Sequence, residues 1–274
     1  MTRGAEPAGG GHGEPFAGAT VPRSAGPDVT ADAYRRRIRL TTTEPGLVVG
    51  GLEDDMHHFR VRLRHDGRRV VAITAEAPRS PWTTCPDAGI RLRDLEGVPL
   101  FERATGAAAH ADPRAHCTHL FDLAGLAVAH AAAGRTRRQY DAEVPVPVDS
   151  RARVRLWRDG APVLSWTLEG GRVVDPPLYA RAPWEGGFLR WADTTLDPDG
   201  AEAAGVLRRA CRIGLGRGMD LDRIATADEL GALMTGICYT MQPERIGHAR
   251  RNRGTIRDFG DRPDDLLGRP GDPA

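Results

Sequence analysis

The stretch that decides the fold covers residues 57–68 and reads HHFRVRLRHDGR. From Phe59 to Leu63, apolar side chains alternate with arginines. This alternation has the period of a β-strand with one apolar and one cationic face. Asp66-Gly67 then favours a tight turn into a return strand. The stretch therefore predicts an antiparallel hairpin that buries one face.

The alternation extends outward over residues 34–78 and recurs at 138–175 between turns that contain glycine. Helical patterns cover residues near 86–96 and 118–133, and they dominate from Gly187 onward. We expect an α+β fold, in which an antiparallel sheet packs against the two central helices. A second β-meander and a helical C-terminal part are expected to follow.

Composition divides the chain into four parts. Residues 1–30 are rich in Gly, Ala and Pro and lack the apolar core of a signal peptide, so we expect a disordered tail. Residues 31–134 are expected to form an α+β core that carries the His/Cys motifs, and residues 135–259 a β-meander plus a helical region. Residues 260–274 are rich in Pro, Gly and Asp and are expected to be a mobile tail. Whether the two middle parts are separate domains stays open.

Local signals predict three further segments. Thr226 and Glu229 form a capping box ahead of an apolar helical pattern that ends near Ile237. A basic helix is expected from Pro243 through residue 253, because proline suits its first position and a glycine follows its end. Residues 104–112 are expected to form a loop.

Composition also excludes some functions. The formal net charge is +1, so nothing attracts the chain to nucleic acid, and no apolar run is long enough to span a membrane. The chain contains no lysine, which excludes a Schiff-base mechanism. Four cysteines without an export signal indicate free thiols in a reducing compartment, so we expect a cytoplasmic protein. Nothing indicates the oligomeric state.

The first chemical cluster is the segment 52–58, which reads LEDDMHH. Its carboxylates and imidazoles suit zinc or iron, although a polar turn with solvated acids is the alternative. His57 falls at the end of the apolar strand face, while His58 shares the arginine face. A buried imidazole at position 57 would need a partner.

The second and third clusters contain cysteines. Cys85 stands just before Pro86 at an expected helix start, where the helix dipole and nearby Arg79 would stabilise a thiolate. Cys117 and His119 would both lie at the start of the next helix if that helix begins at Thr118. The alternatives are core cysteines and surface histidines. No pair of cysteines has C-x-x-C spacing, so a metal site must be assembled from distant segments.

The fourth cluster, residues 238–259, carries several arginines after a break at Pro243. It would hold an anionic substrate or, alternatively, form a solvated charged helix. The chain contains no phosphate-binding glycine loop followed by lysine, no G-x-S-x-G elbow, no H-E-x-x-H and no dinucleotide-binding glycine fingerprint.

The order of the motifs resembles a bacterial family known only as a domain of unknown function, from about Tyr34 to Phe259. The resembling pieces are Tyr34-Arg35-Arg36-Arg37-Ile38, the segment 52–58, His65-Asp66-Gly67, the segment 79–86, Cys117-Thr118-His119-Leu120 and the segment 238–259. This resemblance implies no catalytic role for any residue.

The layout of residues 63–100 also resembles the iron–sulfur scaffold fold of the NifU/SufU type. In that fold, strands lead to a cysteine that opens a helix, and a second cysteine precedes a later helix. Cys85 and Cys117 match these places. The scaffold's Asn-Pro-x-Cys-Gly-Asp loop is absent, and the region after Gly134 has no counterpart. The likeness implies an expectation about layout only.

These observations favour a metal- or thiolate-dependent cytoplasmic enzyme that acts on a small organic anion. The expected metal ligands are His57, Cys85, Cys117 and His119, with zinc or iron as the cofactor and Asp55 and Arg79 as catalytic residues. The alternative functions are a non-catalytic iron–sulfur or sulfur-handling scaffold and a structural metal-binding protein. The expected partner is a small molecule, with neither nucleic acid nor membrane.

Overall fold

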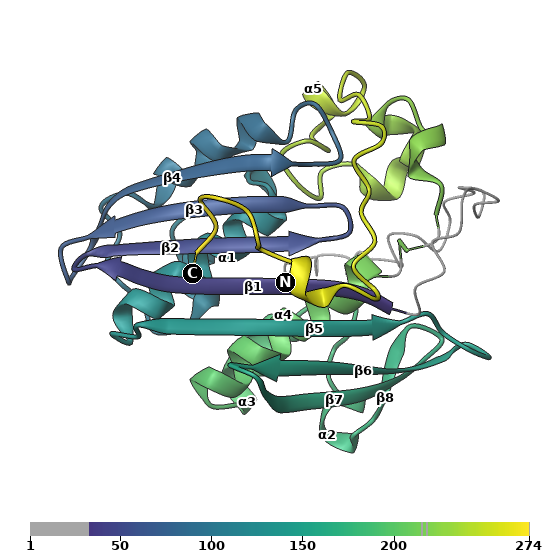
Figure 1. Cartoon of the computed structure of the whole chain (residues 1–274), viewed down its shortest axis with the longest axis horizontal. Helices are drawn as coiled ribbons and strands as arrows, with labels where there is room; N and C mark the ends of the chain where they lie inside the picture. Colours follow the sequence, from purple (N-terminus) through teal and green to yellow (C-terminus); the bar gives the residue numbers. More distant parts are fainter. Residues whose placement is uncertain (1–32, 215, 218, 274) are drawn as a thin grey trace, which may run out of the picture.

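The chain folds around one eight-stranded antiparallel sheet (Figure 1). The computed structural model describes residues 33–214, 216–217 and 219–273, so the tail expected at 1–30 lies outside the described residues. The strands follow the order β4-β3-β2-β1-β5-β6-β7-β8. They are β1 (Ala33–Glu44), β2 (Leu47–Asp54), β3 (His58–His65), β4 (Val70–Arg79), β5 (Arg137–Pro145), β6 (Arg151–Arg158), β7 (Ala161–Glu169) and β8 (Arg172–Asp175).

The hairpin predicted from residues 57–68 is confirmed. β3 pairs with β4, and Gly67 in the connecting turn has a φ of +89°, which a glycine adopts without strain. Phe59, Val61 and Leu63 are fully buried, whereas the arginines between them face the other side. Each buried apolar side chain of this kind stabilises the fold by about 1.5–3 kcal/mol. The α+β class predicted from the sequence is therefore correct.

The second meander belongs to the same sheet as the first. β1 pairs with β5 over nine residue pairs, from Ala33 opposite Pro145 to Thr41 opposite Arg137. The two strand groups expected from the sequence are thus joined through β1 and β5, and the division expected at residue 134 falls between paired strands.

Helices cover one face of the sheet (Figure 1). α1 (Thr118–Ala132) packs on β1, β2 and β3, and α4 (Pro198–Gly214) packs on β5, β6 and β7. The shorter α2 (Pro177–Ala180) and α3 (Phe188–Thr195) complete this layer beside β8 and α4. The hydrophobic core fills the space between this layer and the sheet.

Three segments that precede α1 are 3-10 helices. The helix expected at 86–96 is η1 (Pro86–Leu95), which buries Ala88, Leu92 and Leu95. The loop expected at 104–112 instead begins with η2 (Ala104–Ala109), whose alanines pack against α1. η3 (Pro113–Ala115) follows, and α1 begins only at Thr118 with Cys117 as its N-cap.

Residues 219–259 contain less helix than the sequence predicted. The capping box at Thr226 is present, but it opens η5 (Ala227–Leu230), which is followed by η6 (Ala232–Met234) rather than by a continuous helix. Positive φ angles at Gly231 and Gly236 explain the interruptions. The short 3-10 helix η4 (Leu221–Arg223) precedes them.

The prediction of a basic helix from Pro243 through residue 253 is wrong. α5 (Pro243–Ile246) ends at Gly247, and the chain then forms bridges from Arg250 to Thr226 and from Arg251 to Trp82. These bridges give the backbone partners that a helix would have supplied, so the segment is extended.

The C-terminal segment crosses the face of the sheet opposite the helices, where Figure 1 draws it in yellow across β1 to β3. It contains η7 (Pro263–Asp265), and Leu266 and Leu267 after it are buried. Gly51 of β2 lies directly beneath, because an added Cβ there would be 2.8 Å from Pro273. The tail expected to be mobile is instead packed against the sheet over its described residues. Among the described residues, no helix is both long and apolar enough to cross a membrane.

A close backbone approach between α1 and η2 generates the first prediction. A Cβ added at Gly125 would lie 2.2 Å from the carbonyl oxygen of Ala104. Gly125→Ala must therefore displace η2, and we expect it to lower the free energy of unfolding by about 1–3 kcal/mol in urea titrations.

Gly247→Ala is the matched control, because its added Cβ meets no atom within 4 Å and its φ is −73°. We expect this variant to be as stable as the wild type or slightly more stable. Equal stability of the two variants would show that η2 is not held tightly against α1.

Candidate active site

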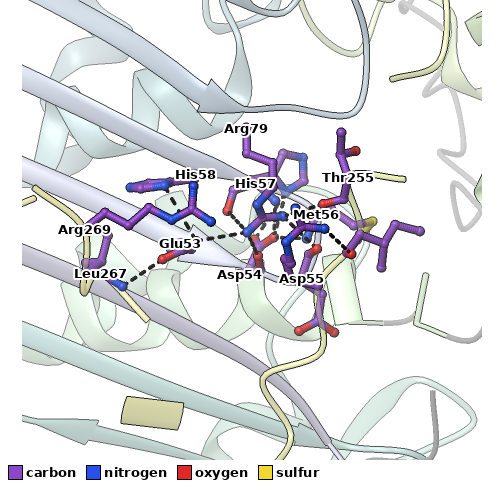
Figure 2. A network of polar contacts seen from close by, with 12 residues as sticks. Glu53, Asp54, Asp55, Met56, His57, His58, Arg79, Thr255, Leu267 and Arg269 are labelled. Carbon is purple, nitrogen blue, oxygen red and sulfur yellow. Dashed lines mark hydrogen bonds and ion pairs between the residues drawn. The ribbon is translucent and has the colours of Figure 1, made fainter. Parts of the chain in front are cut away.

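Four elements converge at one end of the sheet. β2 ends at Asp54, β3 begins at His58, β4 ends at Arg79 and α1 begins at Thr118. Figure 2 shows the 53–58 segment at this end, with dashed lines joining it to Arg79. The segment is buried apart from the half-buried Met56.

Asp54 is the centre of this end of the sheet. Its Oδ1 accepts hydrogen bonds from the backbone N–H groups of Met56 and His57, each at 2.8 Å, which closes the turn between β2 and β3. Its Oδ2 accepts from the Tyr34 hydroxyl at 2.8 Å and from Arg36 Nη2 at 2.6 Å. The side chain has no exposed surface, so these donors replace the water that the carboxylate has lost.

The charge on Asp54 determines which nitrogen of the His57 ring donates a hydrogen bond. Burial alone would raise the pKa of Asp54, but the charges of His57 and Arg36 hold that pKa well below its usual range. His57 Nδ1 lies 2.9 Å from Asp54 Oδ1, and a carboxylate can only accept. Nδ1 therefore carries the proton that it donates to Asp54. When the ring is neutral, Nε2 holds a lone pair that can bind a metal ion or take a proton.

His119 lies against His57. Their ring centroids are 3.9 Å apart with the planes inclined by 30°, so the rings are stacked. Burial, followed by the charges of His57 and Arg36, lowers the pKa of His119 well below its usual value. Its Nε2 is buried and has no hydrogen-bond partner among the described residues. A neutral imidazole with an unused nitrogen is what a metal ligand requires.

Asp54, His57 and His119 together could hold a metal ion. Each offers one ligand atom, and these atoms lie within 4.8 Å of one another. Two imidazoles and a carboxylate suit zinc or non-haem iron. Because Asp54 already accepts from several donors, its better role is to orient His57 through Nδ1, as carboxylates often do for metal-binding histidines.

A second group, Glu53, His58 and Asp272, also brings three ligand atoms within 4.8 Å of one another. Arg79 Nη2 lies 3.2 Å from Glu53, however, and Arg60 Nε lies 2.8 Å from Asp272. The two arginines neutralise both carboxylates and would repel a cation. This group instead fastens the C-terminal segment to the sheet, because His58 Nε2 also contacts Asp272 at 2.7 Å.

Asp55, expected to be catalytic, lies beside the cluster. Burial raises its pKa to about 7, although the charge of Arg217 opposes the shift. Arg217 contacts Asp55 Oδ2 and also pairs with Asp258 at 2.8 Å. The Oδ1 atom of Asp55 is buried without a partner among the described residues. A carboxyl that titrates near neutral pH can both accept and donate a proton.

Arg79 binds the backbone of the turn between β2 and β3. Its guanidinium donates to the backbone oxygens of Asp54 at 2.5 Å, Asp55 at 2.8 Å and His57 at 3.1 Å, as well as to Glu53. Figure 2 shows these bonds spanning the turn. Its Nη1 also donates to the carbonyl oxygen of Thr255 at 3.2 Å. Arg79 therefore holds the turn in shape, and no contact joins it to Cys85, which the sequence had placed near it, among the described residues.

The cysteines lie at the same end of the sheet but outside the cluster. Cys85 precedes η1 and contacts the Thr240 hydroxyl at 3.6 Å, while Cys117 caps α1. Burial raises the pKa of Cys85 to about 11 and that of Cys117 further, so both are neutral thiols near pH 7. Neither belongs to a group of three potential ligands among the described residues. The structure thus joins His57 and His119 and leaves the two cysteines apart. Over the same residues, all four cysteines are free.

Sequence reasoning missed Tyr34 and Arg36 and preferred Asp55 to Asp54. A signal was present for Arg36. In β1, Tyr34, Arg36, Ile38 and Leu40 alternate on the buried face, and an arginine among them indicates a buried acidic partner. That partner is Asp54, which lies opposite Arg36 in the β1–β2 register.

Residues 34–133 match a family described as Protein of unknown function (DUF2889). The match confirms the resemblance noted for the motifs in this part of the chain, and it includes Asp54, His57 and His119. No curated protein matches the chain. The likeness to the NifU/SufU-type scaffold therefore has no support beyond the order of the elements.

The buried ion pair generates a prediction about stability. Removing either charge leaves the other buried and unpaired, so Asp54→Asn and Arg36→Met should each cost about 3–5 kcal/mol of unfolding free energy. The double variant should cost less than the sum of the two single variants. Urea unfolding of the four proteins measures this coupling, and strict additivity would contradict it.

Asp55 generates a prediction about pH. Its pKa is about 7 in the fold against an ordinary 3.8, so the folded protein keeps a proton that the unfolded chain releases. The stability from this proton is complete below about pH 4 and is lost as the pH rises to about 7. Relative to Asp55→Asn, the wild type should lose at most about 4 kcal/mol of unfolding free energy across this window.

Urea titrations at several pH values test this difference. Asp264→Asn, which removes an exposed carboxyl, is the control and should run parallel to the wild type. A difference between wild type and Asp55→Asn that does not change with pH would mean that Asp55 is already ionised at pH 4.

Proposed function

We propose that the protein is a metal-dependent enzyme whose ion is bound by His57 and His119 at the end of the sheet. The observation that carries this proposal is the stacked pair of buried imidazoles, one with an unpartnered Nε2 and the other oriented by Asp54. Leaving a buried polar atom without a partner costs about 1–3 kcal/mol, so the pair needs a reason to exist. A metal ion supplies one.

The donor set favours zinc or iron. Two histidines leave coordination positions open, with the Asp54 carboxylate close enough to serve as a third ligand or to orient His57. An open position is typical of a catalytic metal, whereas a structural zinc has four protein ligands. In such a site the ion activates a water molecule or polarises a substrate oxygen.

Asp55 supports an enzymatic role. It follows Asp54 directly, and its pKa of about 7 suits a group that takes a proton near neutral pH. The adjacent carboxyl groups are thus divided, with Asp54 permanently charged and Asp55 able to titrate. The substrate that we propose is a small organic anion, in a cytoplasmic protein.

A second candidate is acid–base catalysis by His57 without a metal. The hydrogen bond from Nδ1 to Asp54 favours it, because this arrangement leaves Nε2 as the proton acceptor. It does not explain why His119 is stacked on His57 with a buried Nε2 that has no hydrogen-bond partner in the described part of the chain. A sulfur-handling scaffold is less well supported, since no cysteine joins either ligand group among the described residues.

Metal analysis decides between these candidates. We expect elemental analysis of the purified protein to find zinc or iron at about one ion per chain, and titration of metal-free protein to restore it. His57→Ala and His119→Ala should both abolish binding, whereas His248→Ala, which removes an exposed imidazole, should not. Unchanged metal content in both site variants would reject the metal site.

A matched substitution separates function from structure. His119→Leu replaces a buried imidazole, whose Nε2 has no partner among the described residues, by an apolar side chain. The free energy of unfolding of the metal-free protein should therefore rise by about 1–2 kcal/mol. The same variant should bind no metal. If His119→Leu instead destabilises the metal-free protein, His119 is a core residue with a structural role.

A further inference from the structure

A cavity of about 550 Å³ lies between the helical layer and the sheet. Its floor is formed by β1 and β2 through Arg36, Ile38 and Leu52, and its walls come from α1, α3, α4 and η2. The volume is in the range of sites that bind small organic molecules. None of His57, His119 and Asp55 lines it.

The interior of the cavity is mainly apolar. Its lining includes Phe121 and Leu126 of α1, Leu189 of α3 and Val206 of α4, and η2 contributes only small side chains. An apolar ligand would gain from leaving water here. Apolar walls alone do not select a ligand, so the charged residues decide its class.

The acidic side chains in the lining are already neutralised. Asp122 accepts two hydrogen bonds from Arg209, at 2.6 and 3.2 Å, and Asp193 pairs with Arg103. Glu202 is buried and pairs with Arg138, which is outside the lining. The cavity therefore presents no free negative charge from these residues.

Arg208, which also lines the cavity, differs from these residues in its charged neighbours. Among the described residues, it has no carboxylate within 4.0 Å, although its Nη2 and Nε donate to the carbonyl oxygen of Trp184 at 2.5 and 3.2 Å. Its guanidinium lies 5.5 Å from the Trp184 ring centroid and 5.2 Å from that of Phe188. Burial and the neighbouring Arg212 and Arg209 lower the pKa of Arg208 to about 10, against the opposing charges of Glu185 and Asp122.

We propose that this cavity binds a monocarboxylate with an apolar body, and that Arg208 receives the carboxylate. The apolar walls take the body, and Arg208 donates a charge-assisted hydrogen bond to the carboxylate, since no protein carboxylate lies within 4.0 Å of it among the described residues. Arg190 also lines the cavity and is exposed, which adds a second cation that pairs with no carboxylate among the described residues.

The cavity is joined to the candidate active site by Arg36. This arginine lines the cavity floor and bonds Asp54, which in turn bonds His57. The binding proposal itself stands on the cavity alone, so it is tested on protein stripped of metal.

Isothermal titration with octanoate and with 1-octanol tests the proposal. Both probes have the same apolar chain, but only octanoate carries a charge. We expect octanoate to bind at one site and at least about tenfold more tightly than octanol. Arg208→Gln should reduce octanoate affinity by about tenfold and leave octanol affinity unchanged, which also shows that the variant keeps its cavity.

Arg212→Gln is the matched control, because Arg212 is one helical turn away, pairs with Glu185 at 3.6 Å and does not line the cavity. It should bind octanoate like the wild type. Equal affinity for octanoate and octanol, equal losses in the two arginine variants, or no octanoate binding at all would each overturn the proposal. None of these results depends on whether a metal binds at His57 and His119.

Discussion

The buried negative charge of Asp54 is the constraint on which this end of the molecule depends. A carboxylate without exposed surface must be surrounded by donors, and Tyr34, Arg36 and two backbone N–H groups provide them. Satisfying Asp54 closes the turn from β2 to β3 and fixes β1 against β2 at the same place. The backbone geometry of the candidate site thus depends on the contacts of Asp54, together with the hydrogen bonds that Arg79 donates to the same turn.

The same charge divides the titratable groups around it. It gives His57 a defined tautomer, and it contributes to the raised pKa of the neighbouring Asp55. His119 is buried among positive charges and is therefore neutral. This end of the sheet consequently brings together a permanently charged acid (Asp54), an acid that titrates near pH 7 (Asp55) and an uncharged imidazole (His119). Such separation of roles is typical of sites that move protons or hold metal ions.

The sequence predicted those features that depend on local pattern. Alternation in residues 57–68 correctly gave the hairpin, the buried side of the strand and the position of His57 at its end. The pairing of β1 with β5 was not predictable in the same way, because it joins segments about a hundred residues apart and leaves no periodic signal. The prediction of helices within residues 219–259 was wrong for another reason. Their apolar spacing is helical, but glycines with positive φ angles stop each helix after a few residues.

The candidate site was half predictable. His57 and His119 were both named, and their stacking required only that α1 begin at Thr118 at this end of the sheet. The cysteines were misleading, because a thiol before a helix suggests a thiolate only when the surroundings are polar. Here Cys85 packs among Trp82, Met241 and other apolar side chains, and burial outweighs any helix dipole.

Arg36 shows how a single charged residue on an apolar strand face connects two regions. From β1 it neutralises Asp54 on one side and forms part of the cavity floor on the other. A ligand charge placed in the cavity would add its own field at Asp54 to the field of Arg36. The buried ion pair therefore connects the cavity floor to the imidazole pair through contacts between three side chains, those of Arg36, Asp54 and His57.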